Sequence, residues 1–481
     1  MKRQLLFWLI FIIPIALLAQ EQSNIPLEYL EQSFQKYDAM QKKIWANGEL
    51  GFLETKSSAV LQEHLQHEGF EVESGVAGMP TAFVATYGSG YPVIAILAEF
   101  DALPGVSQDT VAQRAPIEPE GNGHACGHNV FGTGSVAGAV AIKQWLAASK
   151  HQGTIKVYGT PAEEGGGGKV YLVRDGFFKD VDVVLDWHPG ARNSVDVANG
   201  YTAAQMIDYR FKGKAAHAAA SPSKGRSALD AVEAMDYMVN MMREHVHYAT
   251  RIHYVITEGG KAPNVVPEDA AVSYYVRHPS RKVLKELVAW VDQIAEAAAM
   301  GTQTTVKREI IAGFYEKLPN RTLAELVQKN LEKVGGVHYD TRERAFAEGM
   351  VEAMGVSKSA LKRAELVQPL AEEVKLKTGG GSTDVGDVSW NVPTITFGTA
   401  AFIPGSPGHS WQNVASAGTT IGTKALINAA KVFVHTALDL YADPSIIDKA
   451  TAEFETRRGK NFKYESLVGD RAPALDYRVD K

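Results

Sequence analysis

The sequence predicts an α/β fold with a mainly parallel sheet, into which a smaller α+β unit is inserted. Strands are expected at continuous apolar runs, which are typical of strands buried on both faces, namely residues 92–98, 154–159, 181–187 and 393–397. Helical stretches at residues 130–148 and 282–300 alternate with strands, which favours a parallel sheet. Three of the four strands run into loops rich in Glu, Asp, His and Gly, where such sheets bind ligands.

The composition is that of a globular protein that can bury a sizeable core. Hydrophobic residues make up 45% of the 481 residues and charged residues 22%. Lys and Arg number 49 against 55 Asp and Glu, so the formal net charge is −6. An acidic chain has no overall electrostatic attraction for nucleic acid, so we expect no such partner. The single cysteine, Cys126, excludes an intramolecular disulfide.

The first residues are typical of a secretory signal peptide. Lys2 and Arg3 precede an uncharged apolar run at residues 5–18, and Ala19 offers a small residue for cleavage. The run is shorter than the ~20 residues that a membrane span needs, although a retained anchor is the alternative. We therefore expect residues 1–19 to be removed and the mature protein to be secreted or periplasmic, without a membrane attachment.

Residues 201–305 differ from the rest of the chain in their expected order of strands and helices. The expected order is strand, helix, strand, strand and helix, with the first four elements at residues 204–211, 227–243, 251–257 and 270–277. Strand and loop patterns of the first kind resume afterwards, so this α+β unit is inserted. The larger domain then consists of residues 20–200 and 306–481.

The first of four loops that carry chemistry, residues 121–129, holds His124, Cys126 and His128 at alternate positions. In an extended segment, alternate side chains point to one side, so we expect all three to face the same space. Thiolate and imidazole are good zinc ligands, which favours half of a metal site. A buried cysteine with incidental histidines and a cysteine nucleophile with a histidine base stay open as alternatives.

The other three loops contribute carboxylates and histidines. Glu163 and Glu164 are adjacent, and such a pair is costly unless a cation or proton relieves the repulsion. One of them can bind a metal while the other acts as a general base, although a solvated acidic loop is the alternative. His188 and His409 occupy the last two loops, where a structural histidine is the alternative. Two metal ions would find enough ligands at this edge of the sheet: Cys126, His128, Glu164, His188 and His409.

Other catalytic classes lack their motifs. The chain has no Gly-x-Ser-x-Gly, which disfavours a serine α/β-hydrolase. It has no complete Gly-x-Gly-x-x-Gly, so dinucleotide binding has no support. The glycine run before Lys169 suggests a phosphate-binding loop, but Val170 stands where that motif needs Ser or Thr.

A set of motifs resembles those of the dinuclear metallopeptidases related to carboxypeptidase G. In order, they are GHACGHN (123–129), TPAEEGGGGK (160–169), DWHP (186–189), KGKAAHAAASPSKGRSALDAVE (212–233), and NVVP (264–267) with YYVR (274–277). The chain looks most like the branch with a cysteine ligand and, within it, the p-aminobenzoyl-glutamate hydrolases. The resemblance covers about residues 37–439, and the combination of motifs is highly specific.

The resemblance implies roles in the metal centre. Cys126 resembles the bridging thiolate, and His128, Glu164, His188 and His409 resemble the remaining ligands of two divalent ions, zinc or manganese. Glu163 resembles the general base.

In the inserted unit, the resemblance implies residues for the substrate and for a partner. His217 resembles a histidine that completes the partner subunit's site; a core histidine is the alternative. Asn264 and Arg277 resemble a substrate-binding pair, with a turn residue and a strand-end salt bridge as the alternatives.

Departures from the family pattern concern several acidic or amide residues. Asn129 stands where many relatives have Asp, so a negative charge that those relatives have is missing here. Glu99-Phe-Asp101 replaces the His-x-Asp of the wider clan, and Glu99 is therefore not assigned as a ligand. Asp384 and Asp387 are expected either to orient ligands or to be solvated loop carboxylates.

The resemblance implies a metal-dependent amidohydrolase that cleaves N-acyl amino acids, with p-aminobenzoyl-glutamate or a related acyl-glutamate or dipeptide favoured. It implies a catalytic domain with an inserted dimerisation or lid domain, and a homodimer, with a homologous A-type subunit left open. A cysteine-dependent amidase that uses Cys126 and a catalytically inactive binding homologue are the other classes considered. The inactive homologue is disfavoured because the chain retains every expected catalytic residue.

Overall fold

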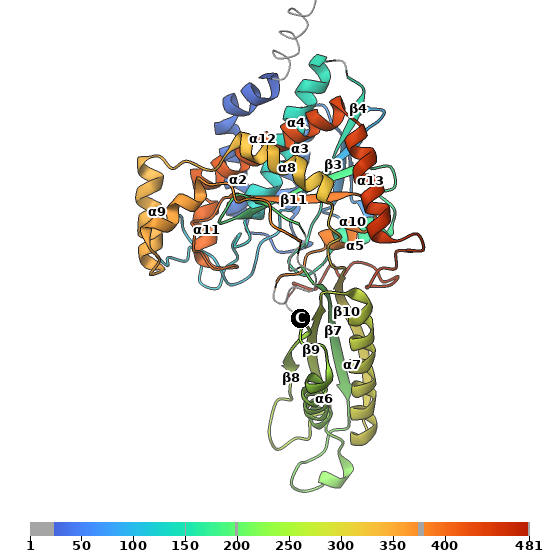
Figure 1. Cartoon of the computed structure of the whole chain (residues 1–481). Coiled ribbons are helices and arrows are strands. Elements are labelled where there is room, and N and C mark those ends of the chain that lie inside the picture. The colour runs from blue at the N-terminus through green and yellow to red at the C-terminus, as the bar shows by residue number, and fades with distance from the viewer. Residues whose placement is uncertain (1–23, 150, 198–200, 374–379, 480–481) are drawn as a thin grey trace, which may run out of the picture.

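The computed structural model describes residues 24–149, 151–197, 201–373 and 380–479, and these form two β-sheets with their helices (Figure 1). The signal peptide expected at residues 1–19 lies outside the described residues. The larger sheet has seven strands in the order β1-β2-β4-β3-β5-β11-β6, and the smaller has four in the order β10-β7-β9-β8. The smaller sheet, with α6 and α7, projects from the larger part of the molecule (Figure 1).

The strands of the larger sheet are β1 (Glu71–Ser74), β2 (Phe83–Ser89), β3 (Val93–Ala98), β4 (Gly153–Gly159), β5 (Val183–Gly190), β6 (Ser194–Val195) and β11 (Thr394–Ala400). Strands β4, β3, β5 and β11 are parallel neighbours, while β1, β2 and β6 pair antiparallel at the edges. The parallel strands are the four that the apolar runs predicted. The α/β prediction with a mainly parallel sheet is therefore confirmed.

Helices cover both faces of the larger sheet. The helices of this part are α2 (Phe34–Asn47), α3 (Thr55–His67), α4 (His128–Ser149), α5 (Gly168–Arg174), α8 (Arg321–Val334), α9 (Thr341–Ala353), α10 (Val385–Ser389), α11 (Trp411–Ala417), α12 (Thr420–Ala442) and α13 (Ser445–Arg458). Helices α4 and α12 pack together over one face, and α5 and α10 lie against the other. With both faces covered, the parallel strands are apolar on both sides.

The smaller sheet consists of β7 (Ala203–Lys212), β8 (Arg251–Glu258), β9 (Asp269–His278) and β10 (Thr305–Phe314), with α6 (Ala228–Met242) and α7 (Arg281–Thr302) on one face. Strand β7 shows the period of two that a half-buried strand requires: Ile207, Tyr209 and Phe211 face the helices. Met206 and Asp208 face the opposite way and line a cavity. The helix-free face therefore forms part of the wall of this cavity.

Strand β10 is an element that the sequence analysis did not foresee. It pairs antiparallel with β7, so the smaller sheet continues to Phe314, past the boundary expected at residue 305. Its first half is exposed or half-buried, as an edge strand is, and this hid it from a search for apolar runs. Along the described part of the chain, no helix is both long and apolar enough to cross a membrane.

Candidate metal centre and active site

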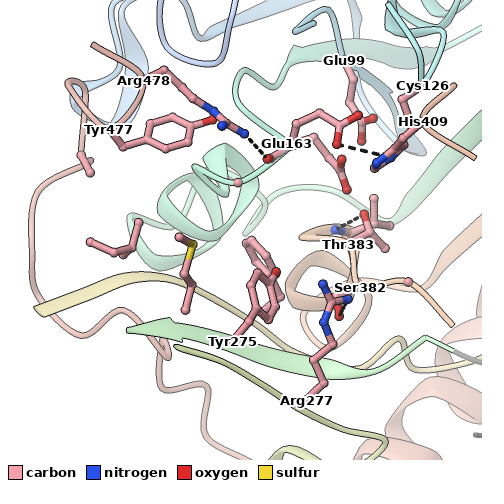
Figure 2. Close-up of a pocket in the computed structure, with 18 of the residues that line it drawn as sticks. Glu99, Cys126, Glu163, Tyr275, Arg277, Ser382, Thr383, His409, Tyr477 and Arg478 are labelled. Carbon is pink, nitrogen blue, oxygen red and sulfur yellow. Dashed lines mark hydrogen bonds and ion pairs between the residues drawn. The ribbon is translucent and has the colours of Figure 1, made fainter. Parts of the chain in front are cut away.

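A cavity of about 1250 Å³ lies between the loops of the larger sheet and the helix-free face of the smaller one. Glu99 follows β3, Glu163 and Glu164 follow β4, and His188 lies near the end of β5. The smaller sheet contributes Arg277 from β9. Figure 2 shows Glu99, Glu163, Cys126 and His409 on one side of this pocket and Tyr275 with Arg277 on the other. The carboxyl ends of the parallel strands therefore form the site, as expected for this fold class.

The loop that carries Cys126 is not extended, and the expectation that His124 faces the same space is wrong. Gly127 has a φ of +76°, and α4 begins at the next residue, so the chain turns within the motif. His124 is buried, with its Nε2 3.1 Å from the carbonyl oxygen of Ile44. A Cβ at Gly127 would lie 2.9 Å from atoms of Phe402 and Pro189, so the turn also needs a glycine.

Two groups of three donor atoms share Cys126. Its Sγ lies within 4.8 Å of one ring nitrogen each of His128 and His188, and within the same distance of Glu164 and His409. The distance from Cys126 Sγ to His188 Nε2 is 3.5 Å. Two ligands of one tetrahedral zinc ion lie about 3.5 Å apart, given bond lengths of about 2.0 and 2.3 Å. The donor set therefore fits a metal centre in which each of the two groups could hold an ion and both groups include Cys126.

Atoms without hydrogen-bond partners agree with this fit. Glu164 Oε1 is buried and has no hydrogen-bond partner among the described residues, whereas the buried Nε2 of His128 lies 3.0 Å from Glu99 Oε2. His409 Nε2 is 3.6 Å from Glu164 Oε2, and its backbone has a φ of +51°, which is uncommon for a residue with a side chain. Metal ions would satisfy these donors, and a strained backbone that positions a side chain is typical of functional sites.

His128 is oriented by carboxylates that the sequence analysis did not assign as its partners. Asp101 Oδ1 lies 2.8 Å from Nδ1 of His128, and Nε2, on the other side of the ring, lies 3.0 Å from Glu99 Oε2. A carboxylate behind a histidine fixes its ring in many metal sites. Burial disfavours the charged ring, but Glu99 and Asp101 raise the pKa of His128. The signal in the sequence is the Glu-Phe-Asp segment after the strand, whose carboxylates could have been assigned to a neighbouring histidine.

A buried lysine holds Glu99 and Asp384. Lys169 Nζ lies 2.6 Å from Glu99 Oε1 and 2.8 Å from Asp384 Oδ1, and all three side chains are almost completely buried. Burial opposes ionisation of Glu99, but Lys169 lowers the pKa of Glu99 overall. Glu99 also forms a third donor group with His128 and Glu163. The alternative of solvated loop carboxylates is wrong for Asp384, because it is fully buried.

Glu163 has the environment of a base rather than of a salt-bridge partner. It lines the cavity beside Glu164, and burial together with the nearby Glu99 raises the pKa of Glu163. A carboxylate with a raised pKa accepts a proton more readily near neutral pH. His188 is different, because burial lowers the pKa of its ring to about 4, which leaves the neutral form that metals bind.

Arg277 points into the cavity from β9. Its Nη1 donates a hydrogen bond to Ser382 Oγ at 3.3 Å, and its guanidinium lies 4.1 Å from the ring centroid of Tyr275. Among the described residues, no acidic side chain forms an ion pair with Arg277, and its Nε is buried without a hydrogen-bond partner. The salt-bridge alternative for this arginine is therefore wrong.

His217 and Asn264 do not line this cavity. They lie beside each other in the turns beyond β7 and β8, where Ala218 N–H donates to the carbonyl oxygen of Asn264 at 3.0 Å. Both residues are exposed, which rules out a core histidine at 217. His217 Nδ1 accepts hydrogen bonds from the N–H groups of Ala219 and Ala220, so its Nε2 carries the proton and points away from its own turn.

The comparison with known proteins agrees with this geometry. A family model described as peptidase family M20/M25/M40 matches residues 95–439. The chain belongs to this family. M20 membership confirms the resemblance drawn from the motifs and identifies the chain as a metallo-amidohydrolase or peptidase, which disfavours a cysteine-dependent amidase.

Relatives within the M20 family span most of the chain. It is 39% identical over 452 residues to the B-type subunit of p-aminobenzoyl-glutamate hydrolase from Escherichia coli, a match that covers 89% of this chain and 93% of that protein. It is 29% identical to the Xaa-Arg dipeptidase of Mus musculus, a match that covers 89% of this chain and 91% of that protein.

Solved structures show the same M20 fold. An aminobenzoyl-glutamate utilization protein from Klebsiella pneumoniae superposes with a TM-score of 0.58 at 18% identity, covering 85% of this chain and 97% of that one. A dinuclear metal-binding peptidase of the M20 family from Bacillus subtilis has a TM-score of 0.55 at 17% identity, covering 86% and 99%.

Proposed function

We propose that this M20 hydrolase cleaves the amide bond of N-acyl amino acids, with N-acyl-glutamates such as p-aminobenzoyl-glutamate favoured. The observation that carries the proposal is the pair of donor groups that share Cys126, at a cavity that Glu163 and Arg277 also line. The name of the relative that is 39% identical supports the choice of substrate.

The proposed metal ligands are Cys126, His128, Glu164, His188 and His409, which would hold two divalent ions, zinc or manganese. When bound, such ions lower the pKa of a water molecule and polarise a carbonyl group. Glu163 takes the proton from the attacking water and passes it to the leaving amine. Arg277 binds the carboxylate of the amino acid through its fork of N–H donors.

The cavity also provides an apolar surface for an acyl group. Met206, Ile311, Phe314 and Tyr275 line the part formed by the smaller sheet and its neighbours. An aromatic acyl group would bury apolar area against these side chains, and each square ångström removed from water contributes about 25 cal/mol. The combination of this surface with Arg277 favours an aryl-acyl amino acid over a free dipeptide.

We propose that the smaller unit dimerises and that His217 acts in the partner subunit's site. Strand β8 is an edge of the four-stranded sheet, and its Tyr254, Val255 and Ile256 are exposed. Unpaired edges with exposed apolar residues favour pairing with another chain. His217 Nε2–H would then stabilise the oxyanion of the partner's substrate. Curated relatives include the A-type subunit of the same hydrolase at 28% identity, so a hetero-oligomer is the competing assembly.

The proposed location is outside the cytoplasm. It rests on the charged and apolar segments before Ala19, which are typical of an exported protein. Expression with residues 1–19 fused to a reporter enzyme would test it, because export moves the reporter activity into the periplasm or medium. Deletion of Lys2 and Arg3 should reduce export, and reporter activity that stays in the cytoplasm would contradict the location.

The test of the function combines metal analysis with a substrate panel. Purified protein is loaded with zinc or manganese and assayed on p-aminobenzoyl-glutamate, benzoyl-glycine and a free dipeptide. We expect about two ions per chain, highest activity on the acyl-glutamate, and loss of activity after EDTA treatment that added metal restores. Activity that survives complete metal removal would instead support thiol chemistry at Cys126.

A further inference from the structure

The C-terminal segment after α13 reaches the active-site cavity, although it lies outside the residues that match the family model. The segment is attached to both parts of the molecule on its way. Tyr464 donates a hydrogen bond to Asp387 Oδ1 at 2.7 Å, and Gln205 Nε2 donates to the carbonyl oxygen of Leu467 at 2.7 Å. Arg174 then donates to the carbonyl oxygen of Arg471 at 2.6 Å. The chain therefore arrives at the cavity along a fixed path.

Glycines beside the metal ligands make room for the end of this segment. A Cβ at Gly51 would collide with the hydroxyl group of Tyr477, and a Cβ at Gly165 would lie 3.2 Å from the Tyr477 ring. The ring packs edge-on against Phe52 at 5.8 Å. Gly165, directly after the adjacent glutamates, thus has a use beyond a tight turn, because a side chain there would crowd Tyr477.

Arg478 follows Tyr477 and lies at the edge of the metal centre. Its Nη2 donates a hydrogen bond to the backbone carbonyl oxygen of Glu164 at 3.1 Å. Figure 2 shows Arg478 and Arg277 on opposite sides of the pocket, with Glu163 between them. Both guanidinium groups therefore face the space where a substrate of Glu163 would bind.

The cations of the cavity differ in their partners. Lys317 forms an ion pair with Asp196, with 2.8 Å between Nζ and Oδ2, and Arg210 forms one with Asp208, with 3.4 Å between Nη2 and Oδ2. Over the described part of the chain, neither Arg277 nor Arg478 forms an ion pair with an acidic side chain. Cations enclosed with a ligand are stabilised when the ligand supplies the counter-charge. A substrate with one carboxylate compensates one of these arginines, whereas a substrate with two compensates both.

We propose that Arg478 is a specificity-determining residue that binds a second carboxylate of the substrate, opposite the one bound by Arg277. The C-terminal segment then selects N-acyl derivatives of dicarboxylic amino acids over those of neutral ones. The inference rests on the proposed function, because it takes an N-acyl amino acid to be the occupant of the cavity.

The test compares N-acyl-glutamate with N-acyl-glutamine, which differ by one carboxylate and have nearly the same shape. Wild type should prefer the glutamate compound, and Arg478→Met should reduce that preference about 10- to 100-fold, mainly through KM. Arg478→Lys should recover part of it. Lys463→Met is the matched control, because it removes the same charge from an exposed position of the same segment that does not line the cavity. It should keep the preference of wild type.

Binding measurements separate this inference from the reaction itself. Isothermal titration of N-acetylglutamate and N-acetylglutamine into the metal-loaded protein reports affinity even where no hydrolysis occurs. Binding that depends on Arg478, without hydrolysis, would support the subsite and contradict the proposed reaction. Hydrolysis with an unchanged preference in Arg478→Met, or an equal loss for both compounds, would contradict the subsite and leave the reaction standing. Absence of both binding and hydrolysis would contradict both.

Discussion

The loops of the larger sheet and the outer turns of the smaller unit both carry motifs of the family, but only the loops of the larger sheet bring their motif residues to the cavity. The five expected metal ligands come from four separate segments and lie close together; four of them line one cavity, and the buried His128 lies beside Cys126 and His188. His217 and Asn264 lie outside that cavity, whereas Arg277, from the same unit, lies inside it. Loops that follow parallel strands lie close together because the strands end at the same edge of one sheet. A turn at the far end of a projecting unit is not held near that edge. The proposal that His217 acts on a second copy of the chain would give this exposed turn a role.

The largest effect is expected from Cys126→Ala. Both donor groups use the sulfur of Cys126, so its loss should weaken both metal sites and lower activity by about 10⁴-fold or more. His409→Ala is the comparison, because His409 belongs to one group only and its loss should spare one ion per chain. Plasma emission spectrometry measures the metal content. Equal metal loss in the two variants would contradict a shared cysteine.

Glu163→Gln should separate catalysis from metal binding. The change removes the proposed base but no proposed ligand, so turnover should fall about 10²- to 10⁴-fold while the metal content stays near that of wild type. Glu164→Gln is the matched control and should lose metal. If the first variant lost its metal and the second kept it, the roles of the adjacent glutamates would be reversed.

A smaller effect is expected on stability at the junction of the two regions. Asp387 is fully buried; its Oδ2 accepts from Tyr315 N–H and its Oδ1 from the hydroxyl group of Tyr464. Burial raises the pKa of Asp387 to about 7, above its unfolded value of about 3.9. The folded state then holds this proton more tightly, so the carboxyl group costs stability progressively as the pH rises from about 4 to about 7.

Asp387→Asn should remove this dependence of stability on pH. The variant should become more stable relative to wild type as the pH rises from 4 to 7. The difference between their free energies of unfolding should grow by up to a few kcal/mol over this range. Urea denaturation at a series of pH values measures the difference. Asp470→Asn, at an exposed position of the C-terminal segment, serves as the control. A difference that does not vary with pH would show that Asp387 is ionised in the fold throughout this range.

Much of the fold was predictable because buried parallel strands leave continuous apolar runs, as at β3 and β5. The grouping of the proposed metal ligands was predictable because thiolate, imidazole and carboxylate groups followed those strands. Strand β10 was missed because an edge strand has no such run. The role of Lys169 was missed because nothing local to its glycine-rich loop shows that two distant carboxylates would bury it. Arg478 was missed for the same reason: its place at the cavity depends on contacts far away in the sequence.

In the proposed dimer, one chain supplies the metal centre and the other supplies His217. Mixing a Glu163→Gln chain with a His217→Ala chain tests it, because each should be nearly inactive as a homodimer. In a mixed dimer, one site would receive both changes and the other neither, so activity should return to nearly half that of wild type per mixed dimer. Tandem affinity tags allow the mixed dimer to be isolated before the assay. Isolated mixed dimers that stay inactive, or a fully active monomer, would contradict the shared site.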